Sequence, residues 1–226
     1  MLVCFSINSS YARKFGETEI TAEEGIEVFQ EEKYYLLKKN VRINSDNFTL
    51  IGDLIKIFFE KDLYDIKIID AEGNVTLNSN EYNIDAEGEK LYFTVENEEI
   101  LIEGIKSKLI TNDSKMYSDG IIKVNNSNGN FYIYGSNSSL ITEEIEIQGN
   151  EIEGAFSSNV NEKEIKFLNV IDEKVAYVNN NETEMYANKI SYNKDTSIIN
   201  LENNVKIISD GEEITGDYGT LDTKTN

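Results

Sequence analysis

The chain has 226 residues and contains no histidine, no proline, no tryptophan and a single cysteine, Cys4. These counts exclude Ser-His-Asp and Cys-His catalysis, zinc sites built from cysteine and histidine, and disulfides within the chain. The formal net charge of −21 disfavours nucleic acid as a partner, because such a surface repels phosphates. We expect no cofactor and no metal, since neither a calcium loop nor a glycine-rich phosphate loop occurs.

The first twelve residues differ from the rest of the chain. A short apolar run, residues 2–7, precedes Ser10 and Ala12, which are small residues at positions −3 and −1 of a signal-peptidase cut before Arg13. We interpret residues 1–12 as a truncated signal peptide, and a plain apolar N-terminus is the alternative. Elsewhere no segment approaches the ~20 apolar residues of a transmembrane helix.

From about Glu19 onward, apolar and polar residues alternate with a period of two, which predicts strands with one apolar and one polar face. The clearest runs are 41–43, 66–68, 91–95, 145–147, 165–167 and 205–207. Clusters of Asn, Ser, Gly and Asp separate these runs and are typical of turns. Residues 23–31 are the best candidate for a short helix, although no sustained helical period occurs. The polar face of each strand favours antiparallel pairing.

An internal repeat links the two ends of the chain. Residues 37–46, LKKNVRINSD, resemble residues 201–210, LENNVKIISD, and the match continues at equal spacing to Gly52-Asp53 and Gly216-Asp217. A weaker third copy covers residues 74–79. Each copy is expected to be a strand, a polar turn and a returning strand, and such hairpins extend a core when they stack. We therefore predict one elongated domain over residues 13–226, with a weak seam near residues 150–161.

These repeated elements resemble the OstA-like, or LptA, family of lipopolysaccharide-transport proteins. The opening of an OstA-like domain resembles residues 20–28, ITAEEGIEV, followed by the hairpin from Asn40 to Gly52-Asp53. Residues 185–192, MYANKISY, followed by residues 201–217, resemble the same element again. The chain is longer than a typical family member, which leaves room for extra strands or a second unit.

The resemblance implies an all-β fold, an elongated, twisted, open antiparallel β-jelly roll built from stacked hairpins. It also implies a non-enzymatic periplasmic protein that binds lipopolysaccharide, shields the lipid A acyl chains in a hydrophobic groove, and bridges the inner and outer membranes. The implied partners are further copies of the chain, head to tail, and inner- and outer-membrane transport proteins joined by β-strand addition. An exposed edge strand without proline suits such pairing.

By alternation, a set of inward-facing apolar residues would line this groove, or would form an ordinary core if no groove exists. The set is Val41, Ile43, Ile55, Ile57, Ile66, Ile68, Leu91, Phe93, Phe131, Ile133, Val205 and Ile207.

Three other functions compete with lipid transport by this protein. One is an inner-membrane-associated OstA-like partner in the same pathway, and another is a structural β-repeat surface protein without a ligand. The third is a carbohydrate-active enzyme, for which adjacent carboxylates such as Glu98-Glu99 and Glu143-Glu144 would be the candidates. Neighbouring residues of a strand point to opposite faces, so these pairs are poorly placed for glycoside hydrolysis. We therefore predict that the protein is not an enzyme.

Overall fold

The computed structural model describes residues 18–61, 65–81, 83–157 and 164–224. The predicted signal peptide at 1–12 and part of the predicted seam at 150–161 lie outside these residues. The regular structure of the described residues is entirely β-strand, so they include no helix that could cross a membrane. The all-β prediction is confirmed. The helix considered for residues 23–31 is wrong, because turns and strand β2 occupy this segment.

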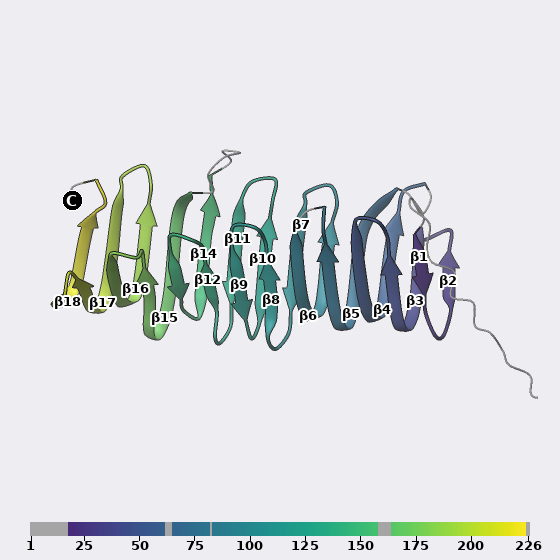
Figure 1. Cartoon of the computed structure of the whole chain (residues 1–226), viewed down its shortest axis with the longest axis horizontal. Coiled ribbons are helices and arrows are strands. Elements are labelled where there is room, and N and C mark those ends of the chain that lie inside the picture. Colours follow the sequence, from purple (N-terminus) through teal and green to yellow (C-terminus); the bar gives the residue numbers. More distant parts are fainter. Residues whose placement is uncertain (1–17, 62–64, 82, 158–163, 225–226) are drawn as a thin grey trace, which may run out of the picture.

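The strands are β1 (Glu19–Thr21), β2 (Ile26–Phe29), β3 (Tyr34–Asn44), β4 (Phe48–Phe59), β5 (Ile66–Ser79), β6 (Ile84–Thr94), β7 (Glu99–Glu103), β8 (Ser107–Ile110), β9 (Lys115–Ser118), β10 (Ile121–Asn125), β11 (Asn130–Tyr134), β12 (Ser139–Ile141), β13 (Glu146–Gln148), β14 (Glu151–Phe156), β15 (Ile165–Asn179), β16 (Thr183–Asn193), β17 (Ile198–Ser209) and β18 (Glu212–Asp222). Their pairings are antiparallel, as the alternation predicted. The strands stack side by side into an elongated molecule, with β1 and β2 at one end and β18 at the other (Figure 1).

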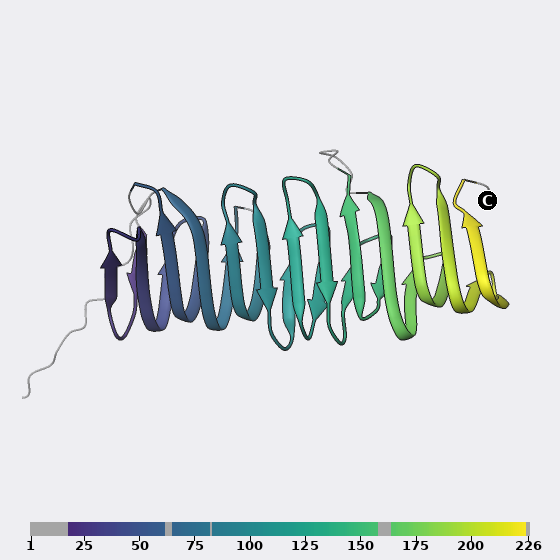
Figure 2. The ribbon, with the colours of Figure 1, turned by 180° about the vertical axis from the view of Figure 1, so that it is seen from behind.

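The sheet folds along its length into two walls that meet at a common corner. Along β3, β4, β5, β15, β16 and β17 the pairing register shifts at the corner, and such bulges bend a strand. The bulges lie between residues 38 and 41, 51 and 54, 72 and 75, 171 and 176, 186 and 189, and 202 and 205. Wall A contains β1, β8, β9, β12 and β13, and wall B contains β2, β7, β10, β11 and β14; each long strand contributes one half to each wall. The view from behind shows the same continuous stack (Figure 2).

The internal repeat corresponds to one type of corner. Its two main copies each place two consecutive residues in the left-handed region, Lys39-Asn40 (φ 65° and 49°) and Asn203-Asn204 (φ 62° and 53°). The weak third copy does the same with Gly73-Asn74 (φ 80° and 48°). Asparagine and glycine tolerate this conformation best among the residues. The repeated Asn-Val dipeptide therefore marks the bend and the inward residue that follows it.

In the middle of the chain the corners interrupt the strands, and buried serines satisfy the backbone there. Ser118 Oγ donates to the carbonyl oxygen of Tyr134 at 2.7 Å and accepts from the N–H of Gly120 at 3.0 Å. Ser138 Oγ donates to the carbonyl of Gly135 at 2.8 Å, and Ser107 Oγ to that of Gly104 at 2.9 Å. These three serines are at most 2% exposed. In the repeat copies, where the strand continues through the corner, a valine follows the bend. Where the strands are interrupted, backbone N–H and C=O groups need other partners, and the serine hydroxyls supply them.

Candidate lipid-binding site

Both walls direct apolar side chains into one continuous core between them. The core extends from Leu37 and Val41 near the first strands to Val205 and Ile207 near the last. Most residues of the predicted groove set lie in this core, namely Val41, Ile43, Ile55, Ile57, Leu91, Phe131, Ile133, Val205 and Ile207. Ile66 and Phe93 are partly buried and pack against its edge. The sequence therefore identified residues of the interior. Binding of lipid by this interior stays a prediction.

Ile68 lies outside this interior. It pairs with Phe58 and Thr94, on the opposite face from the neighbouring core pair Ile57 and Ile69. The cause is a bulge, since the register jumps from Phe58–Ile68 to Phe59–Ile66 and leaves Lys67 unpaired with β4. The extra residue reverses the alternation after Ile66. Ile66 still faces inward, but the next inward residue is Ile69 and not Ile68.

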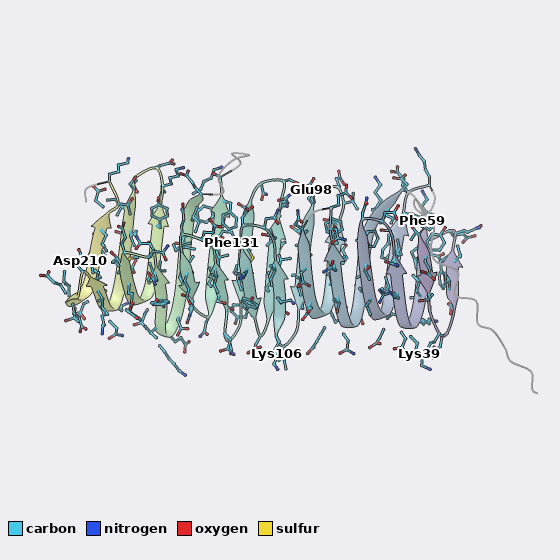
Figure 3. All side chains as sticks on the ribbon, viewed as in Figure 1. Lys39, Phe59, Glu98, Lys106, Phe131 and Asp210 are labelled. Atoms are coloured by element: carbon cyan, nitrogen blue, oxygen red, sulfur yellow. The ribbon has the colours of Figure 1, made fainter. Side chains whose placement is uncertain are left out.

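Opposite the corner, the hairpin turns of the two walls form two rows that we call the mouth. In Figure 3, Lys39 and Lys106 of the corner lie at one edge of the stack, Phe59 and Glu98 lie at the other edge, and Asp210 of the second row of turns lies between. Partly buried apolar residues that pack against the core occur along the mouth on both walls; we call them the mouth residues. They are Ile20, Tyr35, Phe48, Ile66, Ile69, Leu77, Ile84, Phe93, Val124, Ile145, Ile165, Tyr192 and Leu221.

Most mouth residues were missed by the sequence reasoning. Phe48, Ile84 and Ile145 stand beside turns, where a short alternating run cannot be recognised. A signal was available in the turns themselves, because an apolar residue next to an Asn, Ser or Thr turn recurs along the chain. The mouth residues are the only part of the apolar interior, among the described residues, that solvent reaches along the length of both walls.

Away from the mouth and the two ends of the stack, side chains fill the space between the walls. Val41, Leu50, Ile55, Ile102, Ile133 and Ile152 are fully buried. In the middle of the stack the rings of Phe131 and Phe156 pack with their centroids 4.8 Å apart. Protein interiors packed in this way leave few voids larger than a water molecule. The mouth is the side on which no strand of the described residues crosses between the walls.

Charges at the mouth are mainly negative. Carboxylates occur in turns of both rows, including Glu96, Glu98, Glu143 and Glu144. Glu60 pairs with Lys67 at 2.9 Å, and this hydrogen bond lowers the pKa of Glu60 and raises the pKa of Lys67. The carboxylates along the mouth repel the phosphates of a lipid headgroup. Affinity for a lipid would therefore have to come from burial of its hydrocarbon chains. The described residues include no group of three or more Cys, Asp or Glu arranged to hold a metal ion.

Comparison with known proteins gives a family match and similar solved structures. Residues 19–129 match the family described as LptA/(LptD N-terminal domain) LPS transport protein. Among solved structures, the chain is similar to LptH, the LptA homologous periplasmic component of the conserved lipopolysaccharide transport device from Pseudomonas aeruginosa. The identity is 11%, the TM-score is 0.40, and the match covers 48% of this chain and 76% of LptH. No curated protein matches the chain significantly in sequence.

The family match spans β1 to β10 and the turn that follows, and thus includes the first repeat copy, Lys39-Asn40-Val41, and its returning strand to Gly52-Asp53. The same corner recurs at Asn203-Asn204 in the last strands. Residues 19–129, about half of the chain, thus form a domain that matches the LptA/(LptD N-terminal domain) family of lipopolysaccharide-transport proteins.

Proposed function

We propose that this protein is a non-enzymatic, periplasmic component of lipopolysaccharide transport that shields lipid A acyl chains between its two walls. The observation that carries the proposal is the apolar interior, which runs the length of the stack and meets solvent along the mouth residues. The family of residues 19–129 supports the pathway. The residues interpreted as a signal peptide support the compartment.

Hydrocarbon burial is large enough to drive binding without any contact to a headgroup. Each buried methylene is worth about 0.8 kcal/mol, so a chain of ~14 carbons contributes about 10 kcal/mol before ordering costs. Because the interior is filled, entry requires the walls to part at the mouth while the corner holds. Mouth residues such as Phe93 and Val124 would then lose contacts with the core, and acyl carbons would take the place of these contacts.

A substitution at the mouth tests this proposal. Phe93→Asp places a carboxylate among the mouth residues, and we expect it to abolish capture of a fluorescent fatty-acyl probe and of co-purified lipopolysaccharide detected by mass spectrometry. Ile171→Asp is the matched control, since Ile171 is 42% exposed and lies on the outer face of wall B. Circular dichroism would establish that both variants fold. A folded Phe93→Asp protein that still captures lipid would exclude entry at this point of the mouth.

The ends of the stack support head-to-tail association of copies. At one end β2 pairs only with β3 among the described strands, and Ile26 and Val28 are 48% and 50% exposed. At the other end β18 pairs, among the described strands, only with β17, and Ile214 is 62% exposed beside inward-facing Gly216 and Gly219. Apolar side chains at one end would thus meet a glycine-lined surface at the other. Such a heterologous contact repeats along an axis.

Light scattering over a concentration series tests this association. We expect the mass to rise with concentration, and Val28→Lys to keep the protein monomeric by placing an ammonium group in the contact. A wild-type protein that is strictly monomeric at every concentration would refute head-to-tail association. It would leave lipid capture by a single copy as a separate question.

A second candidate function is a structural β-repeat without a ligand. The fully buried residues between the walls favour it, because a filled core needs no occupant. The lipid-capture measurement separates the two functions: a protein that neither co-purifies with lipid nor binds the acyl probe is a structural repeat.

A further inference from the structure

The outer face of wall B carries a strip of tyrosines that neither the interior nor the ends of the stack use. The strip begins at Tyr92 on β6, crosses β7 and β10, and reaches Tyr132 and Tyr134 on β11, strands that follow one another along the stack (Figure 1). The register places Tyr92 opposite Leu101, Leu101 opposite Lys123, and Lys123 opposite Tyr132. Three strand spacings of ~4.8 Å make the strip about 14 Å long.

The strip has a recess at one end and two parallel rings at the other. Tyr92 and Leu101 line a shallow cleft of about 420 Å³, together with Asp70, Glu72, Lys90 and Glu103. The rings of Tyr132 and Tyr134 lie 6.2 Å apart and are parallel to within 5°, and Tyr134 is 49% exposed. The exposed face of such a ring offers an apolar surface on which a ligand can pack.

Polar groups flank the rings in a pattern suited to hydroxyl groups. Lys90 pairs with Glu72 at 3.2 Å, and Lys123 pairs with Glu99 at 3.2 Å. The side-chain carboxylates of Asp70 and Glu103 make no hydrogen bond or ion pair among the described residues. The pKa of Lys90 is raised mainly by its hydrogen bond to Glu72, and the nearby charges of Glu103 and Asp70 raise it further. Unpaired carboxylates beside an ammonium group offer acceptors and a donor within one cleft.

We propose that this strip binds a chain of neutral sugars, lying along the long axis of the stack. The C–H face of a pyranose packs on the negative face of a tyrosine ring, and its hydroxyls donate to the carboxylates. A strip of about 14 Å accommodates several linked sugars, with one in the cleft at Tyr92 and one on the pair Tyr132–Tyr134. The surrounding carboxylates disfavour an anionic glycan through charge repulsion.

Calorimetric titration of the full chain with three tetrasaccharides tests the proposal. The probes are N-acetylated chitotetraose, its deacetylated form, and tetragalacturonate as the anionic member. We expect N-acetylated chitotetraose to bind and tetragalacturonate not to bind, whereas binding of the deacetylated form alone would identify attraction of its ammonium groups and overturn the proposal. Tyr92→Ala and Tyr134→Ala should each weaken binding by about tenfold or more, which corresponds to ~1.4 kcal/mol. Tyr218→Ala is the matched control, because Tyr218 is 64% exposed on the outer face of β18, far from the strip.

Several results would overturn the proposal. These are the absence of binding by N-acetylated chitotetraose, wild-type affinity in Tyr92→Ala or Tyr134→Ala, or an equal loss in Tyr218→Ala. Competition by spermine at similar affinity would instead identify an ammonium site. Thermal unfolding of each variant shows whether the fold is retained. None of these outcomes depends on lipid capture, so the strip and the transport function can fail independently.

Discussion

Gly154→Ala tests how tightly the interior is packed in the middle of the stack. Gly154 on β14 faces inward, opposite the predicted groove residue Phe131. A Cβ at this position would lie 2.4 Å from Cζ of Phe131 and 2.7 Å from the backbone oxygen of Phe167. The Phe131 ring cannot move away freely because it packs against Phe156. Overpacking of this kind costs about 1–3 kcal/mol, which for a chain of this size lowers Tm by about 2–12 °C.

Urea and thermal unfolding followed by circular dichroism or by fluorescence of the 13 tyrosines would measure the loss. Gly216→Ala is the control, since the nearest atom to its Cβ would be 3.5 Å away, and its stability should change by less than about 1 kcal/mol. Phe131→Leu removes Cζ, so the double variant should be more stable than the sum of the single losses predicts. Unchanged stability in Gly154→Ala would refute close packing here and would indicate a preformed space between the walls.

Three further predictions concern the corner, the surface and alkaline pH. Ser118→Ala should lower the free energy of unfolding by about 1–3 kcal/mol in urea titration, because the carbonyl of Tyr134 loses its buried donor; a loss below 0.5 kcal/mol, on the order of an exposed hydrogen bond, would contradict this. Lys108→Ala should cost only about 1 kcal/mol or less despite two ion pairs, and the difference from wild type should shrink in 1 M salt. The hydrogen bond to Glu184, with burial, raises the pKa of Tyr186 from 10 to about 12. The folded protein thus holds this proton more tightly, so stability present below pH 10 falls between pH 10 and 12; Tyr186→Phe should remove that part of the decline, and an identical profile would refute the assignment.

The bulges explain where sequence reasoning and structure differ. Alternation is reliable within one half of a strand, so Val41 and Ile43, or Val205 and Ile207, were correctly placed inside. An extra residue reverses the alternation, and nothing local in Ile66-Lys67-Ile68-Ile69 indicates which isoleucine of the pair 68–69 faces inward. The partner strand decides, because Ile57 and Phe58 fix the faces across the register.

Other features of the site also depend on contacts between distant segments. The mouth residues are defined by two rows of turns that the chain visits alternately, and the tyrosine strip unites residues from Tyr92 to Tyr134 on strands that only the register brings together. The buried serines at the interrupted corners look like turn residues in the sequence. Their burial becomes evident only when backbone carbonyls from neighbouring strands surround them.

The sequence by itself determined the secondary-structure class, the antiparallel pairing and the repeated bend at Asn-Val, because side-chain period and left-handed propensity are local properties of the chain. Only the tertiary structure decided that the sheet folds into two walls, which isoleucines lie between them, and that side chains fill the space rather than leave it open. Those outcomes depend on register and on packing between segments far apart in the sequence, and neither is encoded in any single strand.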